Sequence, residues 1–446
     1  MWETLRATLD YNRRDIVMII ILALVNVVLF LPMMERWQIM GDYVVHNQLA
    51  GDAIENTVSF LRNTPHFLYH IAVASTQQLT SSPDINTSAT WVMTACIASM
   101  AITIYWYLRR QSALPATLSV IVLSGILALC LNIIMPINFF TPENLYFGYF
   151  AAHVYHNPTI IIMTPFAIVI FYIAQQLFLN DTPVSRWMIL PLALLTALSL
   201  VAKPSFIIAY VPTLGLVTAW LMLRCRSDIS TIFRNPKTIW QAFTFTDAER
   251  TNDLPMMLRP SYINWSVLIF GLVLPTFAVL YYQTITWTSS GGIGIDPLRV
   301  LYEWTLHYDD NADQQLIYKF IMSTSFPLAV YILHFKSARK HFSLNVTWLL
   351  LGVSAIYYYL FVDYTVIAAG DFGWSIQIAV LMLYIVSTAF ILQEYPQTLT
   401  GNTLSRWGRV KLTICIALFA LHVVAGIHWY RLHMSQYIEE LIYIWW

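Results

Sequence analysis

Long hydrophobic segments recur along almost the whole chain, and they restrict the possible folds more than any other feature. Of the 446 residues, 58% are hydrophobic and only 11% are charged, whereas roughly 25% of the residues in a soluble domain are charged. A helix of about 20 apolar residues matches the hydrocarbon core of a bilayer, which is ~30 Å thick. The sequence therefore predicts an all-α, polytopic membrane protein, with residues 1–446 forming a single integral membrane domain.

Eleven segments have the length and composition of a transmembrane helix. They are residues 16–33, 88–107, 113–134, 158–178, 187–202, 204–223, 263–283, 314–334, 344–361, 373–393 and 412–429. No small-residue cleavage site follows the first segment, so we expect it to be a retained anchor and not a signal peptide. Lys203 and Pro204 separate the fifth and sixth segments. Because proline ends or kinks a helix, these two segments are expected to form a tight hairpin.

Basic residues are distributed unevenly between the two sides of this arrangement. Eighteen of the 24 lie in alternate loops, and the six on the opposite side are Arg36, Arg62, Lys203, Arg299, Lys319 and Arg431. Since cytoplasmic loops carry the excess of Lys and Arg, we expect the N-terminus in the cytoplasm and the C-terminus outside. The basic inner loop 224–262 is expected to rest on anionic lipid headgroups. The net charge of zero gives no indication of a nucleic-acid partner.

The first outer loop, 34–87, contains a polar run over residues 41–52. Asp42 and His46 stand four residues apart in it, so on a helix they share one face. We interpret Asp42 as a candidate general base, and His46 as a group that orients it or shares its proton. Farther along, residues 59–73 mix apolar and aromatic side chains with Arg62 and two histidines, which is typical of a helix lying in the membrane interface.

The second outer loop is rich in aromatic residues and ends in His153, His156 and Asn157, directly before Pro158. Proline at this place is expected to open the following helix. Aromatic rings offer flat apolar faces to sugars, and His and Asn side chains hydrogen-bond hydroxyl groups, so we interpret this cluster as substrate-binding. Aromatic residues at this depth are equally typical of an interfacial belt.

Four further residues are candidates for substrate binding. Lys203 interrupts an apolar run near the outer side, where it either neutralises a phosphate as a point charge or extends toward the interface. Arg62 is a second candidate phosphate ligand. Asp371 and Trp374 lie at the start of the predicted segment 373–393. They either cap this helix and place a tryptophan in the membrane interface, or lie in a cleft.

Metal-binding patterns are weak in this sequence. The four cysteines stand singly, without the spacing of a zinc site or a disulfide framework. Asp309, Asp310 and Asp313 could bind a divalent cation, but adjacent aspartates are also typical of a solvated turn. We therefore expect no cofactor and no metal, with a divalent cation as the alternative.

Ionisable residues are nearly absent from the predicted transmembrane segments, and 15 of the 24 acidic residues fall on the outer side. Ion-coupled transporters place acidic groups near the bilayer midplane. Many of them are also built from internal repeats, and none is visible in this sequence. The distribution favours an enzyme that works at the outer leaflet on a lipid-linked substrate.

This layout resembles the GT-C superfamily of polyprenyl-phosphate-sugar-dependent glycosyltransferases. Its members have a short cytoplasmic N-terminus, a first span and a large outer loop with an acidic residue near its start, which here is Asp42. Residues 156–159, 203–206 and 370–374 also look like patches of bacterial multi-span proteins of this type. The resemblance implies an inverting transfer of a sugar from a polyprenyl-phosphate donor to a glycan, lipid or protein acceptor. It also implies that Asp42 is the general base and that the protein resides in a bacterial plasma membrane.

Other functions remain open from the sequence. Several GT-C families have a pair of acidic residues where this chain has Asp42 alone. A glycan polymerase or ligase would use outer-loop Arg and His residues instead of an acid. A non-catalytic or pigment-binding membrane subunit would use His422 and His428 as ligands, and a transporter is a further alternative.

Overall fold

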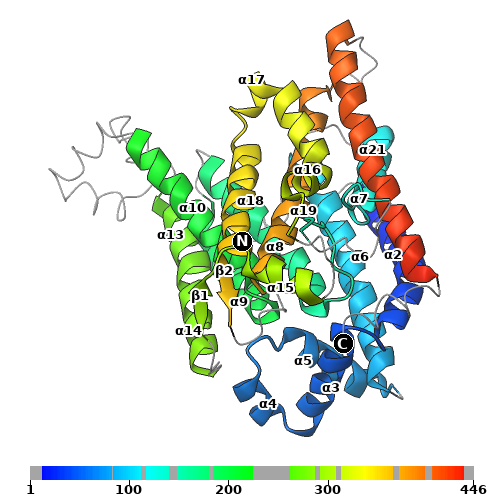
Figure 1. The fold of residues 1–446 in the computed structure, drawn as a ribbon, viewed down its shortest axis with the longest axis vertical. Coiled ribbons are helices and arrows are strands. Elements are labelled where there is room, and N and C mark those ends of the chain that lie inside the picture. The colour runs from blue at the N-terminus through cyan, green and yellow to red at the C-terminus, as the bar shows by residue number, and fades with distance from the viewer. Residues whose placement is uncertain are drawn as a thin grey trace, which may run out of the picture.

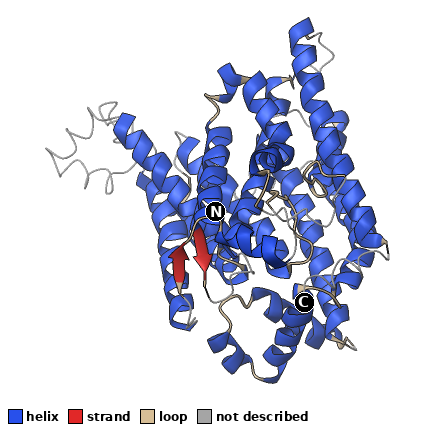
Figure 2. Cartoon of the chain, viewed as in Figure 1, coloured by secondary structure: helices blue, strands red, loops and turns tan. Residues whose placement is uncertain are grey.

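The computed structural model describes residues 13–82, 84–111, 117–139, 148–179, 184–224, 262–286, 292–307, 313–364, 371–396 and 404–435. Within these ranges the chain is almost entirely helical, and one two-stranded sheet is present (Figure 2). The all-α fold predicted from the sequence is therefore confirmed. Almost all of the basic loop 224–262 lies outside the described residues, as do Asp309 and Asp310.

Eight helical segments of the described chain are apolar and long enough to cross a membrane. They are Arg13–Trp37 (α2), Ile85–Gln111 (α6), Pro158–Leu179 (α8), Asn264–Ile285, Leu316–Leu333 (α16), Phe342–Leu360 (α18), Trp374–Glu394 (α19) and Arg406–Met434 (α21). The fourth of these combines α13 (Tyr262–Leu268), a π-helical turn (Ile269–Val273) and α14 (Leu274–Thr286). Each of the eight coincides with a segment predicted from the sequence.

The three remaining predicted segments are also apolar helices. They are α7 (Leu118–Leu131), α9 (Ile189–Ala202), which a 3₁₀ turn at Arg186–Met188 precedes, and α10 (Ser205–Arg224). At 1.5 Å per residue, the 14 residues of α7 span about 21 Å, less than the ~30 Å hydrocarbon core. Lys203 and Pro204 interrupt the helix between α9 and α10, and these two helices contact each other.

Three short helices gather at the end of the bundle drawn lowest in Figure 1, which we call the Asp42 end. They are α3 (Asp42–Glu55), α4 (Thr57–Asn63) and α5 (Leu68–Thr80). The helix predicted over residues 59–73 is therefore two helices, because the chain leaves the helical conformation around Pro65.

The other short elements lie in the second half of the chain. Strand β1 (Ile293–Ile295) pairs antiparallel with β2 (Phe361–Asp363), with Gly294 opposite Val362. Helix α15 (Arg299–His307) follows β1, α17 (Phe335–Ala338) lies at the end opposite Asp42 (Figure 1), and a 3₁₀ turn at Asp371–Gly373 leads into α19.

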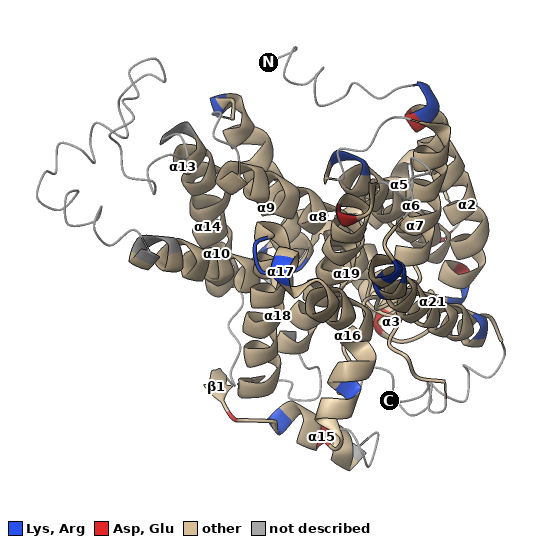
Figure 3. Cartoon of the chain, turned by 90° about the horizontal axis from the view of Figure 1, so that it is seen from above, with Lys and Arg blue, Asp and Glu red and all other residues tan. Residues whose placement is uncertain are grey.

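Helix α19 is the centre of the bundle. It is buried along nearly its whole length and packs against α18, α10, α16, α6 and α8. Helices α2 and α21, by contrast, are mostly uncovered. On α2, Ile20, Leu24 and Val28 are 53%, 61% and 73% exposed at four-residue spacing, and long stretches of helix carry no charged residue (Figure 3). An apolar stripe of this kind requires lipid and not water around it.

Gly426 marks the closest approach of α21 to the chain that follows α7. A Cβ atom at this position would lie 1.7 Å from the carbonyl oxygen of Ile133, a backbone atom that cannot move without shifting the chain after α7. We expect Gly426→Ala to lower the free energy of unfolding by about 3 kcal/mol or more, as overpacking does. Thermal unfolding in detergent measures this effect.

Gly352 on α18 provides the matched control. A Cβ there meets nothing within 4 Å, and alanine is the better helix former by about 1 kcal/mol. Gly352→Ala is therefore expected to unfold at the same temperature as the wild type or a higher one. Equal stability of the two variants would contradict the packing of α21 described here.

Candidate active site

Asp42 opens α3 directly after Gly41, at a sharp turn out of α2. Gly41 has φ 53°, a conformation that favours glycine. The Nδ2 atom of Asn157 donates a hydrogen bond of 2.7 Å to Oδ2 of Asp42. These residues are 115 positions apart in the sequence, so tertiary packing of α3 against the start of α8 brings them together.

Asn157 is held in one orientation by the helix that it precedes. Its Oδ1 accepts hydrogen bonds from the hydroxyl of Thr159 at 2.7 Å and from the backbone N–H of Ile160 at 3.2 Å. Pro158 begins α8 as predicted, so Asn157 is the N-cap of this helix. Because the amide oxygen is engaged, the amide NH₂ must face Asp42. Oδ2 of Asp42 is therefore an acceptor, and a proton taken up by Asp42 binds to Oδ1.

Removal of the Asn157 cap should cause a measurable loss of stability. We expect Asn157→Ala to lower the free energy of unfolding by about 1 kcal/mol, the usual effect of removing an N-cap side chain. Thr117, which precedes α7, makes no capping hydrogen bond with its side chain. Thr117→Ala should consequently leave the unfolding temperature unchanged, and an equal fall in both variants would contradict the role given to Asn157.

Lys203 is the electrostatic centre of this region. It is the C-cap of α9 and is 8% exposed. Its ammonium group lowers the pKa of Asp42, and it lowers the pKa values of His46, His66 and His156 as well. One positive charge thus acts on four titratable side chains that come from three separate parts of the chain.

Aromatic rings from α2 and α19 lie beside Lys203 and His156. The Nζ atom of Lys203 lies 5.1 Å from the ring centroid of Trp374, the first residue of α19. The ring of His156 lies 5.8 Å from that of Trp374 and 6.2 Å from that of Trp37, centroid to centroid. Flat apolar faces therefore stand beside the carboxylate and the ammonium group.

Two further histidines complete the polar cluster. Nδ1 of His46 lies 2.9 Å from Nε2 of His70 on α5. His66, one turn before His70, lies with its Nδ1 3.4 Å from Nε2 of Gln283 on α14. The same amide nitrogen donates to the carbonyl oxygen of Pro65 at 3.0 Å, and this contact fixes the start of α5 on α14.

These residues form one group around Lys203. Asp42, His46, His66 and His156 are densely surrounded by protein, because burial is the largest cause of each pKa shift, yet all four keep part of their surface accessible. We infer from this combination that the four side chains border a recess in the protein surface. We call this group the Asp42 recess, and its members are Asp42, His46, His66, His156, Asn157, Lys203 and Trp374.

Burial gives the titratable groups of the recess distinct protonation states. It raises the pKa of Asp42 above its ordinary value, although Lys203 and Asn157 oppose this change. It lowers the pKa values of His46, His66 and His156 to about 3 in each case. At neutral pH these histidines are uncharged, and a carboxylate with a raised pKa is a stronger base than one in water.

Three long helices begin at the recess. Asn157 precedes α8, Lys203 stands two residues before α10, and Trp374 opens α19. Each helix N-terminus carries a partial positive charge and free backbone N–H groups. Together with the ammonium group of Lys203, they produce a field that favours an anionic ligand.

The structure places the candidate residues from the sequence in two groups. Asp42, His46, His156, Asn157, Lys203 and Trp374 all belong to the recess. His153 points elsewhere, because its Nε2 is 2.7 Å from the carbonyl oxygen of Leu131 and its ring stacks on Tyr155. Arg62 is exposed on α4. Asp371 starts the 3₁₀ turn before α19, whose N-cap is Gly373, and its side chain lies outside the described part.

The other buried polar groups have structural partners. Asp15 forms an ion pair of 3.0 Å with Arg109, at the end of the bundle opposite Asp42. Nδ1 of His422 lies 2.8 Å from the carbonyl oxygen of Met135, and Nε2 lies 2.8 Å from the hydroxyl oxygen of Ser325. Because both ring nitrogens are engaged, His422 does not suit a pigment ligand. Among the described residues, no group of three His, Cys, Asp or Glu side chains is arranged to hold a metal ion.

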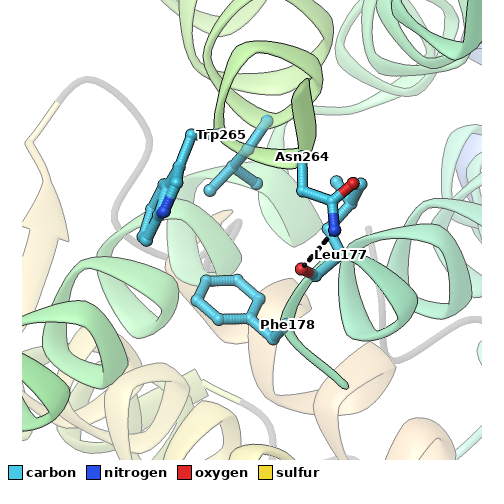
Figure 4. A pocket seen from close by; sticks show the side chains of 5 residues that line it. Leu177, Phe178, Asn264 and Trp265 are labelled. Atoms are coloured by element: carbon cyan, nitrogen blue, oxygen red, sulfur yellow. Dashed lines mark hydrogen bonds between the residues drawn. The ribbon is translucent and has the colours of Figure 1, made fainter. Parts of the chain in front are cut away.

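A separate pocket lies between the C-terminal end of α8 and helix α13 (Figure 4). Leu177, Phe178, Asn264, Trp265 and Leu268 line it. The Asn264 side chain is occupied, since its Nδ2 donates to the carbonyl oxygen of Leu177 and its Oδ1 accepts from the N–H of Val184. This pocket is mostly apolar and offers no titratable group for chemistry.

No protein-family model matches the chain, and no curated protein sequence matches it significantly.

Proposed function

We propose that this protein is a membrane glycosyltransferase of the GT-C type. It transfers a sugar from a polyprenyl-phosphate donor to a glycan, lipid or protein acceptor at the extracytoplasmic face of the membrane, with inversion. The observation that carries this proposal is the arrangement of Asp42, Asn157 and Lys203: an enclosed carboxylate, held through one oxygen, beside a buried cation.

The chemistry divides between the two charged side chains. Oδ1 of Asp42 takes the proton from the acceptor hydroxyl, whose oxygen then attacks the anomeric carbon of the donor. The bond between that carbon and the phosphate oxygen breaks, and the phosphate leaves with the bonding electrons. Lys203 and the nearby helix N-termini stabilise its negative charge. Because phosphate is a good leaving group, one carboxylate suffices, unlike the two that glycoside hydrolysis requires.

The aromatic side of the recess suits the sugar. The rings of Trp374 and Trp37 both lie near the ring of His156, and a neutral imidazole both donates and accepts hydrogen bonds with hydroxyl groups. We infer that the ring of the donor sugar packs here.

The proposed topology has eleven spans, counting α7, α9 and α10 with the eight longer segments. The N-terminus is then cytoplasmic, the C-terminus extracytoplasmic, and the Asp42 recess faces the outer side of a bacterial plasma membrane. Helices α8, α10 and α19 all run inward from the recess in this scheme. Cysteine labelling from outside tests it: Arg62→Cys on exposed α4 should react with an impermeant reagent, and Lys336→Cys on α17 should not.

The direct test uses proteoliposomes and a panel of polyprenyl-phosphate-linked sugars. At least one donor should release free polyprenyl phosphate faster in the presence of the purified protein than in its absence. A mixture of acceptor glycans or a membrane extract supplies the acceptor. If no donor of this class is consumed under any of these conditions, the proposed function is wrong.

The histidines of the recess favour a second candidate, a glycan polymerase or ligase. Such an enzyme works with histidine and arginine side chains instead of a carboxylate, and His46, His66 and His156 would take that part. The two candidates differ in their dependence on Asp42.

A further inference from the structure

The segment that links α14 to α16 keeps large apolar side chains exposed. Ile293 and Ile295 on β1 are 68% and 70% exposed, and Leu298, Tyr302 and Leu306 are 39%, 48% and 58% exposed at four-residue spacing. On a soluble protein, exposed apolar residues are usually scattered singly. We call these five residues the α15 surface. Their number in so short a segment indicates an apolar environment around it.

Backbone hydrogen bonds fix this segment at the end of a membrane helix. The N–H of Asp296 donates to the carbonyl oxygen of Leu360 at 2.9 Å, and the N–H of Leu298 donates to that of Tyr359 at 2.7 Å. Both carbonyl groups belong to the last turn of α18, which is long and apolar enough to cross a membrane. Helix α15 therefore begins at the level where a membrane helix ends, and it lies at the periphery of the bundle (Figure 3).

The side chains of α15 fall into three sectors around the helix axis, because each residue is rotated by about 100° from the one before. Val300, Leu301 and Trp304 form the first sector, which is buried in the protein. The ring centroid of Trp304 lies 6.1 Å from that of Tyr358 on α18, so this sector attaches α15 to the bundle. The second sector is the α15 surface, on the other side of the helix.

Arg299 and Glu303 make up the third sector, on one flank between the other two. Their side chains form an ion pair of 2.9 Å and are 34% and 17% exposed. The guanidinium group also lies 5.7 Å from the ring centroid of Tyr302. An apolar face with charged groups on its flank is typical of a helix that lies in the plane of a membrane interface. Since the two charges neutralise each other, apolar burial and not attraction to anionic lipids would hold it there.

The exposed apolar surface continues on both neighbouring helices. Tyr281 and Ile285 at the end of α14 are 70% and 60% exposed, and Ile317 and Tyr318 at the start of α16 are 79% and 47% exposed. Both helices have the length and composition of membrane spans, so these side chains face lipid. Exposed tyrosines at the ends of membrane helices are typical of the boundary between membrane and water, and Tyr302 lies between them in the sequence.

We propose that α15 is an interfacial helix, covered by lipids of the leaflet on the side of the Asp42 recess. The α15 surface contacts acyl chains, Arg299 and Glu303 lie among the headgroups, and Trp304 faces the protein. The ring of Tyr358 connects this helix to the recess, because a Cβ atom at Gly373, directly before Trp374, would lie 2.9 Å from it. The recess then lies close to headgroup depth, whichever reaction it carries out.

Spin labelling in lipid nanodiscs tests this position without a substrate. Single cysteines replace Leu298, Tyr302 and Leu306 in the full-length protein, whose four native cysteines are changed to alanine. Electron paramagnetic resonance measures collisions of each label with oxygen, which concentrates among acyl chains, and with a water-soluble nickel chelate. We expect an oxygen-to-nickel ratio several-fold above that of Asp52→Cys on exposed α3, and near that of Val28→Cys, a site 73% exposed on α2.

Arg299→Cys tests the orientation of α15 about its axis. Because this flank is expected among the headgroups, its oxygen-to-nickel ratio should be lower than at the three apolar sites, and equal ratios at all four would refute the orientation. Predominant access of nickel to the three apolar sites would show a helix in water and overturn the proposal. Little access of either reagent would show that protein, such as a second copy of the chain, covers the surface, and would overturn it as well.

Thermal unfolding in nanodiscs gives a second measurement that needs no label. We expect Tyr302→Asp to unfold at a lower temperature than Tyr302→Ala, because moving a carboxylate from water into an apolar environment is costly. In water the order would be reversed, since an acidic residue near the start of a helix favours the helix. An unfolding temperature of Tyr302→Asp at or above that of Tyr302→Ala would therefore contradict the proposal. Neither experiment measures transfer, so failure here leaves the proposed function untouched.

Discussion

Asp42→Asn is expected to reduce transfer by about 10²- to 10⁴-fold, the range that a positioned general base contributes. The amide matches the carboxylate in shape, and its oxygen can still accept the hydrogen bond from Asn157. Because burial disfavours the charge at this position, we expect the unfolding temperature of the variant to equal or exceed that of the wild type. Transfer kinetics and thermal unfolding are measured on the same preparation.

Asp52 supplies the control for this substitution. It lies on the same helix but is exposed, so Asp52→Asn removes one negative charge without touching the recess and should keep full activity. A glycan polymerase or ligase that relies on histidines would instead lose little activity in Asp42→Asn. Nearly wild-type transfer by Asp42→Asn would therefore reject Asp42 as the base and favour that second candidate.

The sequence was sufficient to predict the helices but not their packing. Apolar length alone located the segments, and Lys203-Pro204 correctly marked the break between α9 and α10. The helix expected over residues 59–73 was wrong because a single proline at position 65 outweighed a favourable composition. Nothing local indicates that α19 is the buried centre, since its composition matches that of helices which face lipid.

The residues of the Asp42 recess were also predictable only in part from the sequence. Asp42 and His46 could be selected from their four-residue spacing on a predicted helix. His66 and His70 repeat this spacing in the sequence, although His66 lies just before α5, which begins at Leu68. Gln283 could not be found this way, because it meets His66 across 217 positions of the sequence. His153 and His156 look equivalent in the sequence, yet only His156 is in the recess. The turn before α8 directs the first toward Leu131 and the second toward Trp374.

Lys203→Met is expected to weaken donor binding and to shift the pH dependence of transfer. Loss of a charged hydrogen bond to phosphate corresponds to about 1.5–3 kcal/mol, or roughly a 10- to 100-fold rise in the KM for the donor. Lys203 lowers the pKa of Asp42 and of His46, so its removal raises both pKa values. Since Asp42 acts unprotonated, the rise of activity with pH should occur at a higher pH in Lys203→Met than in the wild type.

Lys319 is the matched control for this prediction. It is also a buried lysine beside an aromatic ring, 5.8 Å from the centroid of Tyr149, but it is not among the groups that shift the pKa of Asp42. Lys319→Met should therefore leave the pH at which activity rises unchanged, whatever it does to stability. A shift to lower pH in Lys203→Met, or an identical shift in both variants, would show that the ammonium group of Lys203 does not act on Asp42. The phosphate would then have to be held by another part of the outer surface.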